Sequence, residues 1–70
     1  MREQKEVTVA GRILRDTGAA ILLEVDNEDL EGEVIQHWIP TSQVSRIIHY
    51  ANGIADVTMA QWIAAKKGLI

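Results

Sequence analysis

The side chains best suited to nucleophilic catalysis are Ser42, Ser45 and His49, which lie close together in the sequence. A serine nucleophile needs a base within hydrogen-bond reach and a third group that orients the base. No glycine frames either serine as an elbow would, and a chain of 70 residues leaves little room for a deep substrate pocket. We therefore expect a protein that is not an enzyme.

Metal binding is the second chemistry to consider, because His37 and His49 accompany an acidic segment at residues 24–33. A calcium loop of the EF-hand type needs acidic residues at its first, third and fifth positions, and a loop starting at Asp26 has Leu30 at the fifth. The chain has no cysteine, and two histidines are too few for most zinc sites. We predict no metal site and no cofactor, and we interpret the acidic segment as a solvated hairpin tip.

Single-strand nucleic-acid binding is a third possibility, since small barrels stack bases on aromatic side chains and hold phosphates with cations. The candidate residues are Arg12, Arg15, Arg46, Trp38 and Tyr50. The net charge of −3 opposes this role, because phosphate contacts dominate the affinity of most nucleic-acid binders. A local basic face nevertheless remains an alternative.

Five short strands are predicted to position these side chains. Alternating apolar residues and β-forming types indicate strands over residues 7–15, 19–26, 33–39, 45–50 and 54–57. Gly11 interrupts the first strand and indicates a bulge or a close backbone approach. Pro40 ends the third strand, and residues 41–44 fit a tight turn of 3₁₀ type. Asn52 and Gly53 form a strong hairpin signal.

A helix is predicted over residues 59–67 from signals at its beginning. Thr58 and Gln61 fit a capping box, in which Thr58 is the N-cap. Val57 and Trp62 have the spacing of a hydrophobic staple. We therefore expect the Trp62 side chain to be buried.

The end of that helix completes a single predicted domain over residues 1–70. Gly68 fits the position after the C-cap, and Leu69 would pack back on Ala64 as in a Schellman motif. Residues 1–6 are predicted to be a flexible lead-in. The fold class is mainly β: a small five-stranded SH3-like barrel with one short C-terminal helix, or alternatively an OB-like barrel.

Two segments resemble a group of short uncharacterised proteins encoded by bacteriophages and prophages. The segments are residues 37–44 (HWIPTSQV) and residues 57–69 (VTMAQWIAAKKGL). In that group a Trp-Ile-Pro-x-Ser-Gln stretch ends a strand, and a later helix ends in Lys-Gly-Leu. The chain departs from the pattern at Met59, where proline is common. The resemblance spans about residues 7–70 and implies a phage accessory protein or an inhibitor of a host protein, without assigning catalytic residues.

The chain carries more apolar side chains than one small interior can hold, because several predicted strands are apolar on both faces. The surplus predicts a protein interface, of which self-association is the simplest form. The interface candidates are Leu22, Trp38, Ile48 and Tyr50. The sequence leaves open whether Trp38 belongs to the core or to the surface.

Two functions from different classes follow from these observations. The first is a non-catalytic binding module that forms a homo-oligomer and contacts an unidentified host or phage protein. The second is a binder of single-stranded nucleic acid or nucleotides. No apolar run approaches the length of a membrane helix, and the charged N-terminus lacks the pattern of a secretory signal, so we expect no membrane contact and a cytoplasmic location in a bacterial host cell.

Overall fold

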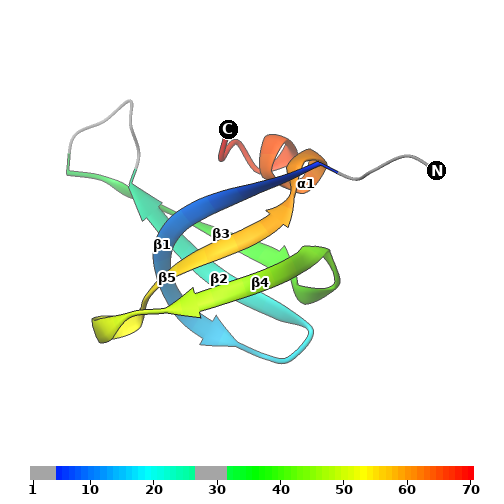
Figure 1. Cartoon of the computed structure of the whole chain (residues 1–70). Coiled ribbons are helices and arrows are strands. Elements are labelled where there is room, and N and C mark those ends of the chain that lie inside the picture. Colours follow the sequence, from blue (N-terminus) through cyan, green and yellow to red (C-terminus); the bar gives the residue numbers. More distant parts are fainter. Residues whose placement is uncertain (1–4, 27–31) are drawn as a thin grey trace.

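The computed structural model describes residues 5–26 and 32–70, which form one antiparallel sheet and a short helix (Figure 1). The elements are β1 (Glu6–Asp16), β2 (Ala20–Asp26), β3 (Val34–Pro40), β4 (Val44–His49), β5 (Ile54–Ala60) and α1 (Gln61–Lys66). The mainly β prediction is confirmed. Residues 1–4 of the predicted lead-in and residues 27–31 of the predicted acidic hairpin tip lie outside the described residues.

The strand order in the described sheet is β3-β2-β1-β5-β4, so β3 and β4 are its two edges. The sheet is not closed into a barrel, and the predicted SH3-like or OB-like barrel is therefore not confirmed. A single 3₁₀ turn at Thr41–Gln43 connects the two edge strands, β3 and β4, which do not pair with each other in the described sheet.

Strand β1 is shared between two halves of the sheet. Its Glu6–Arg12 part pairs with β5, and its Arg12–Asp16 part pairs with β2. A register shift between Ile13 and Arg15 marks a bulge in the second part, and β1 is visibly curved in Figure 1. Bulges bend and twist a strand. The curvature therefore turns the two halves of the sheet toward each other.

Gly11 lies where the two halves meet. A Cβ atom at this position would lie 2.6 Å from the carbonyl oxygen of Glu24 on β2. The close backbone approach that the sequence predicted at Gly11 is confirmed, whereas the bulge lies further along β1, at Leu14. Glycine at this position allows β1 and β2 to come together.

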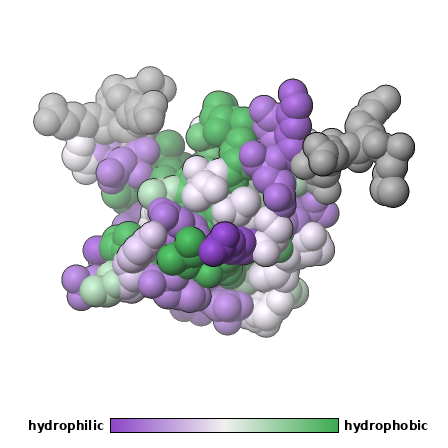
Figure 2. Space-filling model, in the orientation of Figure 1, coloured by the Kyte–Doolittle hydropathy of each residue, from purple (hydrophilic) through white to green (hydrophobic). Residues whose placement is uncertain are grey.

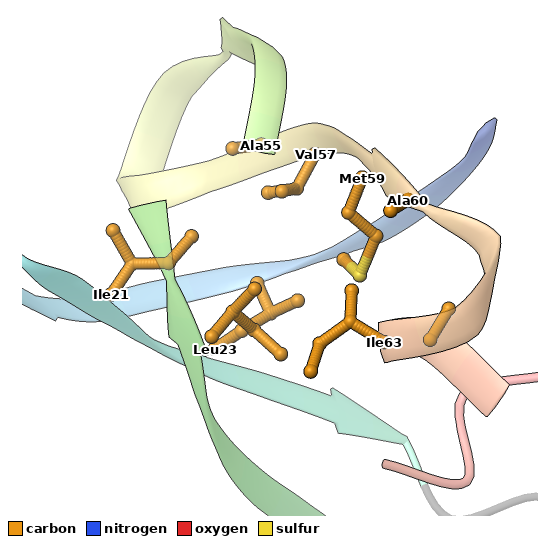
Figure 3. Close-up of a cluster of buried hydrophobic side chains, with 9 residues drawn as sticks. Ile21, Leu23, Ala55, Val57, Met59, Ala60 and Ile63 are labelled. Carbon is orange, nitrogen blue, oxygen red and sulfur yellow. The ribbon is translucent and has the colours of Figure 1, made fainter. Parts of the chain in front are cut away.

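The core lies between the two halves of the sheet, and α1 covers one end (Figure 3). It consists of aliphatic side chains, alanines and one methionine: Ile21, Leu23, Ile39, Ala55, Val57, Met59, Ala60, Ile63 and Ala64. The alternation of Ile21 and Leu23 on β2, and of Val57 and Met59 on β5, follows from the two-residue period of a strand.

Two turns between strands are well defined, and the second is the predicted turn at Asn52 and Gly53. The Gly18 N–H donates to Asp16 Oδ1 at 2.8 Å, and the Thr41 hydroxyl donates to the carbonyl oxygen of Gly18 at 2.9 Å. Asn52 and Gly53 both have positive φ, at 63° and 77°, in the turn between β4 and β5. Asparagine and glycine are the residues that adopt this region most readily.

The predicted start of the helix is wrong. β5 continues to Ala60, and Thr58 lies opposite Thr8 of β1, with their hydroxyl oxygens 2.9 Å apart. Helix α1 therefore begins at Gln61 instead of residue 59 and ends at Lys66 instead of residue 67. Without the staple, the Trp62 side chain is 51% exposed instead of buried.

The predicted Schellman motif after the helix is present. The Leu69 N–H donates to the Ala64 carbonyl at 2.8 Å, and the Gly68 N–H donates to the Ala65 carbonyl at 3.1 Å. These are the two hydrogen bonds of a Schellman motif, and Gly68 has the positive φ that the motif requires.

At the other end of the chain, Glu6 belongs to β1 and not to a flexible lead-in, because it pairs with Ala60.

Candidate binding surfaces

The strand register divides the candidate residues of the sheet between an inner face, which covers the core, and an outer face turned away from it. Leu22 lies opposite Trp38, while the neighbouring Leu23 lies opposite His37 on the inner face. Successive side chains of a strand point to opposite faces of the sheet. All sequence-predicted candidates on the strands alternate with the inner-face residues, and they therefore belong to the outer face.

The first group of candidates lies on β2 and β3, and we call Leu22 and Trp38 the β3 patch. The Trp38 side chain is 44% exposed, which answers the question that the sequence left open. Leu22 is half-buried beside it, and Arg15 of β1 lies opposite Leu22 in the neighbouring pair. Because β3 is an edge of the sheet, this patch reaches a strand whose outer backbone side has no partner within the described sheet.

The second group lies on β4 and just after its end, and we call Ile48, Tyr50 and Arg46 the β4 patch. Ile48 lies opposite Asp56, and Arg46 lies opposite Thr58. The Tyr50 hydroxyl donates to Asp56 Oδ2 at 3.0 Å. This hydrogen bond, then the charge of Asp56, and then slight desolvation raise the pKa of Tyr50 above its ordinary value.

Arg12 stands between the two patches, opposite Ile54 on one side and Glu24 on the other. The structure therefore does not bring the five residues of the nucleic-acid alternative into one cluster. Arg15 accompanies Trp38, whereas Arg46 accompanies Tyr50. Figure 2 shows the same mixture, since hydrophobic and hydrophilic side chains alternate over the face in view instead of forming one continuous patch.

The sequence did not predict a hollow of about 620 Å³ between β1 and β2. Beyond the Arg12–Glu24 pair the two strands separate, because β1 continues along β5 and β2 continues along β3. Figure 1 shows this divergence, with the C-terminus between the two strands. The described lining residues are Thr8, Val9, Ala10, Val25, Asp26, Ile35, His37, Gly68, Leu69 and Ile70. Gly11 was the one sequence signal near this feature, and it marks the point where the strands meet.

His37 is the titratable inner-face residue of this hollow. Its partial burial, and then the positive charge of Lys67, lower its pKa below the ordinary value. Both effects disfavour the protonated imidazole, since burial penalises a charge and Lys67 repels it. His37 is therefore held in its neutral form near neutral pH.

The residues considered for catalysis are placed on the surface. Ser45 donates from its hydroxyl to the Thr58 carbonyl oxygen at 3.4 Å, and Ser42 and His49 are exposed. Within residues 5–26 and 32–70, no hydrogen bond joins His49 to a serine, and no three histidine or acidic side chains converge as metal ligands would. None of the helices in the described part of the chain combines the length and the hydropathy of a membrane span.

Comparisons of the chain with protein-family models, with curated proteins and with solved structures found no match in any of the three.

Proposed function

We propose that the chain is a non-catalytic binding module that acts through protein–protein contacts and associates with itself through the β3 patch. The setting that the two resembling segments imply is that of a phage accessory protein or an inhibitor of a host protein. The partner in self-association is a second copy of the chain. Its further partner would be a host or phage protein.

The observation that carries the proposal is the exposure of Trp38 on an edge strand. Its indole is 44% exposed, and Leu22 lies beside it on the outer face. Val34 on the same strand is 50% exposed, and Val34–Pro40 contains no lysine, arginine, aspartate or glutamate. Natural edge strands are usually protected by charges, by covering segments or by shortness. A seven-residue edge without charges is therefore suited to pairing with another strand.

The central position of a tryptophan also fits an interface. Tryptophan is enriched among the few residues that carry most of the binding energy at protein interfaces. A specific interface buries about 1,200–2,000 Å² in total. An edge strand and the adjoining outer face of β2 together offer a surface on which a second copy can add contacts on both sides of Trp38.

The experiment is a measurement of molar mass by light scattering after gel filtration, over a range of protein concentrations. We expect the unmodified chain to be a dimer or larger, and Trp38→Glu to be a monomer that keeps its fold. Trp62→Glu is the matched control, because its indole is exposed to a similar extent but lies on α1. A monomer at every concentration for the unmodified chain, or an equal effect of both substitutions, would contradict the proposal.

Nucleic-acid binding remains the second candidate, and one observation favours it. Arg12, Arg46 and Tyr50 lie on the outer face of the same half of the sheet. Glu24, however, lies opposite Arg12, and Asp56 accepts the Tyr50 hydroxyl hydrogen bond, so two carboxylates on this face oppose a phosphate backbone. A fluorescently labelled oligothymidine at low salt tests this candidate: binding that weakens with salt and is lost in the Arg46→Glu variant supports it, and absence of binding removes it.

A further inference from the structure

We propose that the hollow between β1 and β2 binds an extended peptide segment of another protein, which pairs with β1 as an added strand. This site is distinct from the β3 patch, and it does not depend on self-association. The proposal rests on the direction of the backbone groups, on the shape of the hollow and on its lining.

The first step is the direction of the backbone groups of β1. The Gln61 N–H donates to the Lys5 carbonyl at 2.9 Å, so the backbone of Lys5 faces β5. In an antiparallel pair, residues alternate between those whose N–H and C=O face the partner and those whose groups face away. Val7 and Val9 therefore face β5, and Thr8 and Ala10 direct their N–H and C=O groups into the hollow.

The backbone groups at the end of β2 also point toward the hollow, by an independent observation. The Thr41 N–H donates to the Ala19 carbonyl at 3.0 Å, which places the backbone of Ala19 toward β3. By the same alternation, Glu24 and Asp26 face β1. Glu24 meets Arg12 there, at the last pair of the β1–β2 ladder, and Asp26 faces the hollow.

The backbone groups of Thr8 and Ala10 that point into the hollow have no strand partner within the described sheet. The β1–β2 register covers Arg12 to Asp16, and within the described sheet Thr8 and Ala10 have no strand partner on the side of the hollow. An unpaired strand edge is a template for an added strand, because its donors and acceptors already have the spacing of a ladder. The side chain of Thr8 is engaged elsewhere, with Thr58 on the outer face.

The volume and the apolar lining of the hollow suit an extended peptide. A hollow of about 620 Å³ lies within the range of sites that hold small ligands or a few residues of peptide. Val9, Val25 and Leu69 are partly buried at its floor, and Ile35 is 38% exposed. An extended peptide with alternating apolar and polar side chains would direct its apolar side chains onto this floor while its backbone pairs with β1.

A defined peptide tests the proposal. The probe is an acetylated and amidated Lys-Val-Thr-Val-Thr-Lys, added to the full chain labelled with ¹⁵N. We expect shifts of the Thr8, Ala10 and Asp26 amide signals, and slower hydrogen exchange at Thr8 and Ala10. An analogue with N-methylated valines and threonines keeps the side chains but removes the backbone donors, and we expect it to produce no shifts. Binding of the analogue with equal affinity, shifts confined to the outer face, or no binding of the parent peptide would overturn the proposal.

Ala10→Pro provides the matching change in the protein. Proline removes the Ala10 N–H, which faces the hollow, without removing a donor to β5, and proline is tolerated where a strand N–H has no partner. We expect peptide binding to weaken about tenfold, as the loss of one backbone hydrogen bond predicts. Trp38→Ala is the control and should leave peptide affinity unchanged. Unchanged affinity in a folded Ala10→Pro variant contradicts the site, and the N-methylated analogue decides the question if this variant does not fold.

Discussion

The inner and outer faces of the sheet differ in how completely they bury apolar side chains. The inner face buries aliphatic residues such as Leu23, Ile39 and Val57 completely. The three aromatic residues of the chain are all on the outside: Trp38, Tyr50 and Trp62 are 44%, 55% and 51% exposed. The fold thus obtains its core from small and aliphatic side chains. The aromatic side chains, which contribute most to interfaces, remain accessible to a second molecule.

The strongest test of this comparison uses two adjacent leucines on opposite faces. Leu23→Ala removes a fully buried side chain and should lower the free energy of unfolding by about 2–5 kcal/mol. Leu22→Ala removes the same atoms from the half-buried outer face and should cost less than about half as much. Urea denaturation followed by circular dichroism measures both. Equal losses would show that the two faces do not differ as described.

The contact between the two halves of the sheet is the next point to test. Gly11→Ala places a methyl group 2.6 Å from the Glu24 carbonyl oxygen, so β1 and β2 must move apart. We expect a loss of about 1–3 kcal/mol in the free energy of unfolding. Ala10→Gly, at the neighbouring residue, should cost about 1 kcal/mol or less. The denaturation midpoints of the two variants provide the comparison, and a neutral Gly11→Ala would argue against a tight crossing.

A smaller effect is expected from the imidazole on the inner face. The pKa of His37 is lowered in the folded protein, so the unfolded chain binds a proton more readily. The stabilisation is therefore fully present above the ordinary value of 6.5 and is lost as the pH falls through the interval between 6.5 and the lowered pKa. We expect His37→Gln to reduce this pH dependence in thermal melts, and an unchanged pH dependence in this variant would contradict its assignment to His37.

The smallest expected effect is a change in the pKa of Tyr50 on the outer face, which leaves the fold unchanged. The chain has one tyrosine, so its ultraviolet absorbance titration reports Tyr50 alone. We expect ionisation above the ordinary pKa of 10.0, because Asp56 accepts its hydrogen bond and repels the phenolate. Asp56→Asn should lower the pKa toward the ordinary value. An unchanged titration would mean that the Tyr50–Asp56 contact does not persist in solution.

Short-range signals in the sequence predicted much of this fold. Pro40, Asn52 and Gly53 act through their own backbone preferences, and the turns at these residues lie where the sequence placed them. The Schellman motif around Gly68 is similarly local. The predicted strand over residues 19–26 also corresponds closely to β2 at Ala20–Asp26.

The errors concern contacts between distant parts of the chain. Thr58 and Gln61 have the spacing of a capping box, but pairing of Thr58 with Thr8 extends β5 and displaces the helix start. That choice depends on a strand 50 residues away, which no local pattern can report. The hollow beside β1 has the same kind of origin. It depends on where the pairing of β1 with β2 stops, at Arg12 and Glu24, while β1 continues to pair with β5.

Because β1 pairs with both β2 and β5, its two parts must form their pairs at different times during synthesis on the ribosome. The Arg12–Asp16 part of β1 meets β2 soon after it is made, whereas Thr8 must wait for Thr58, which is translated 50 residues later. Until then the first part of β1 is exposed on both edges, and pairing at such sequence separation is slow. Nascent chains should therefore remain sensitive to proteases at residues 6–11 until nearly the whole chain has emerged, and a truncation before β5 should leave that segment unprotected.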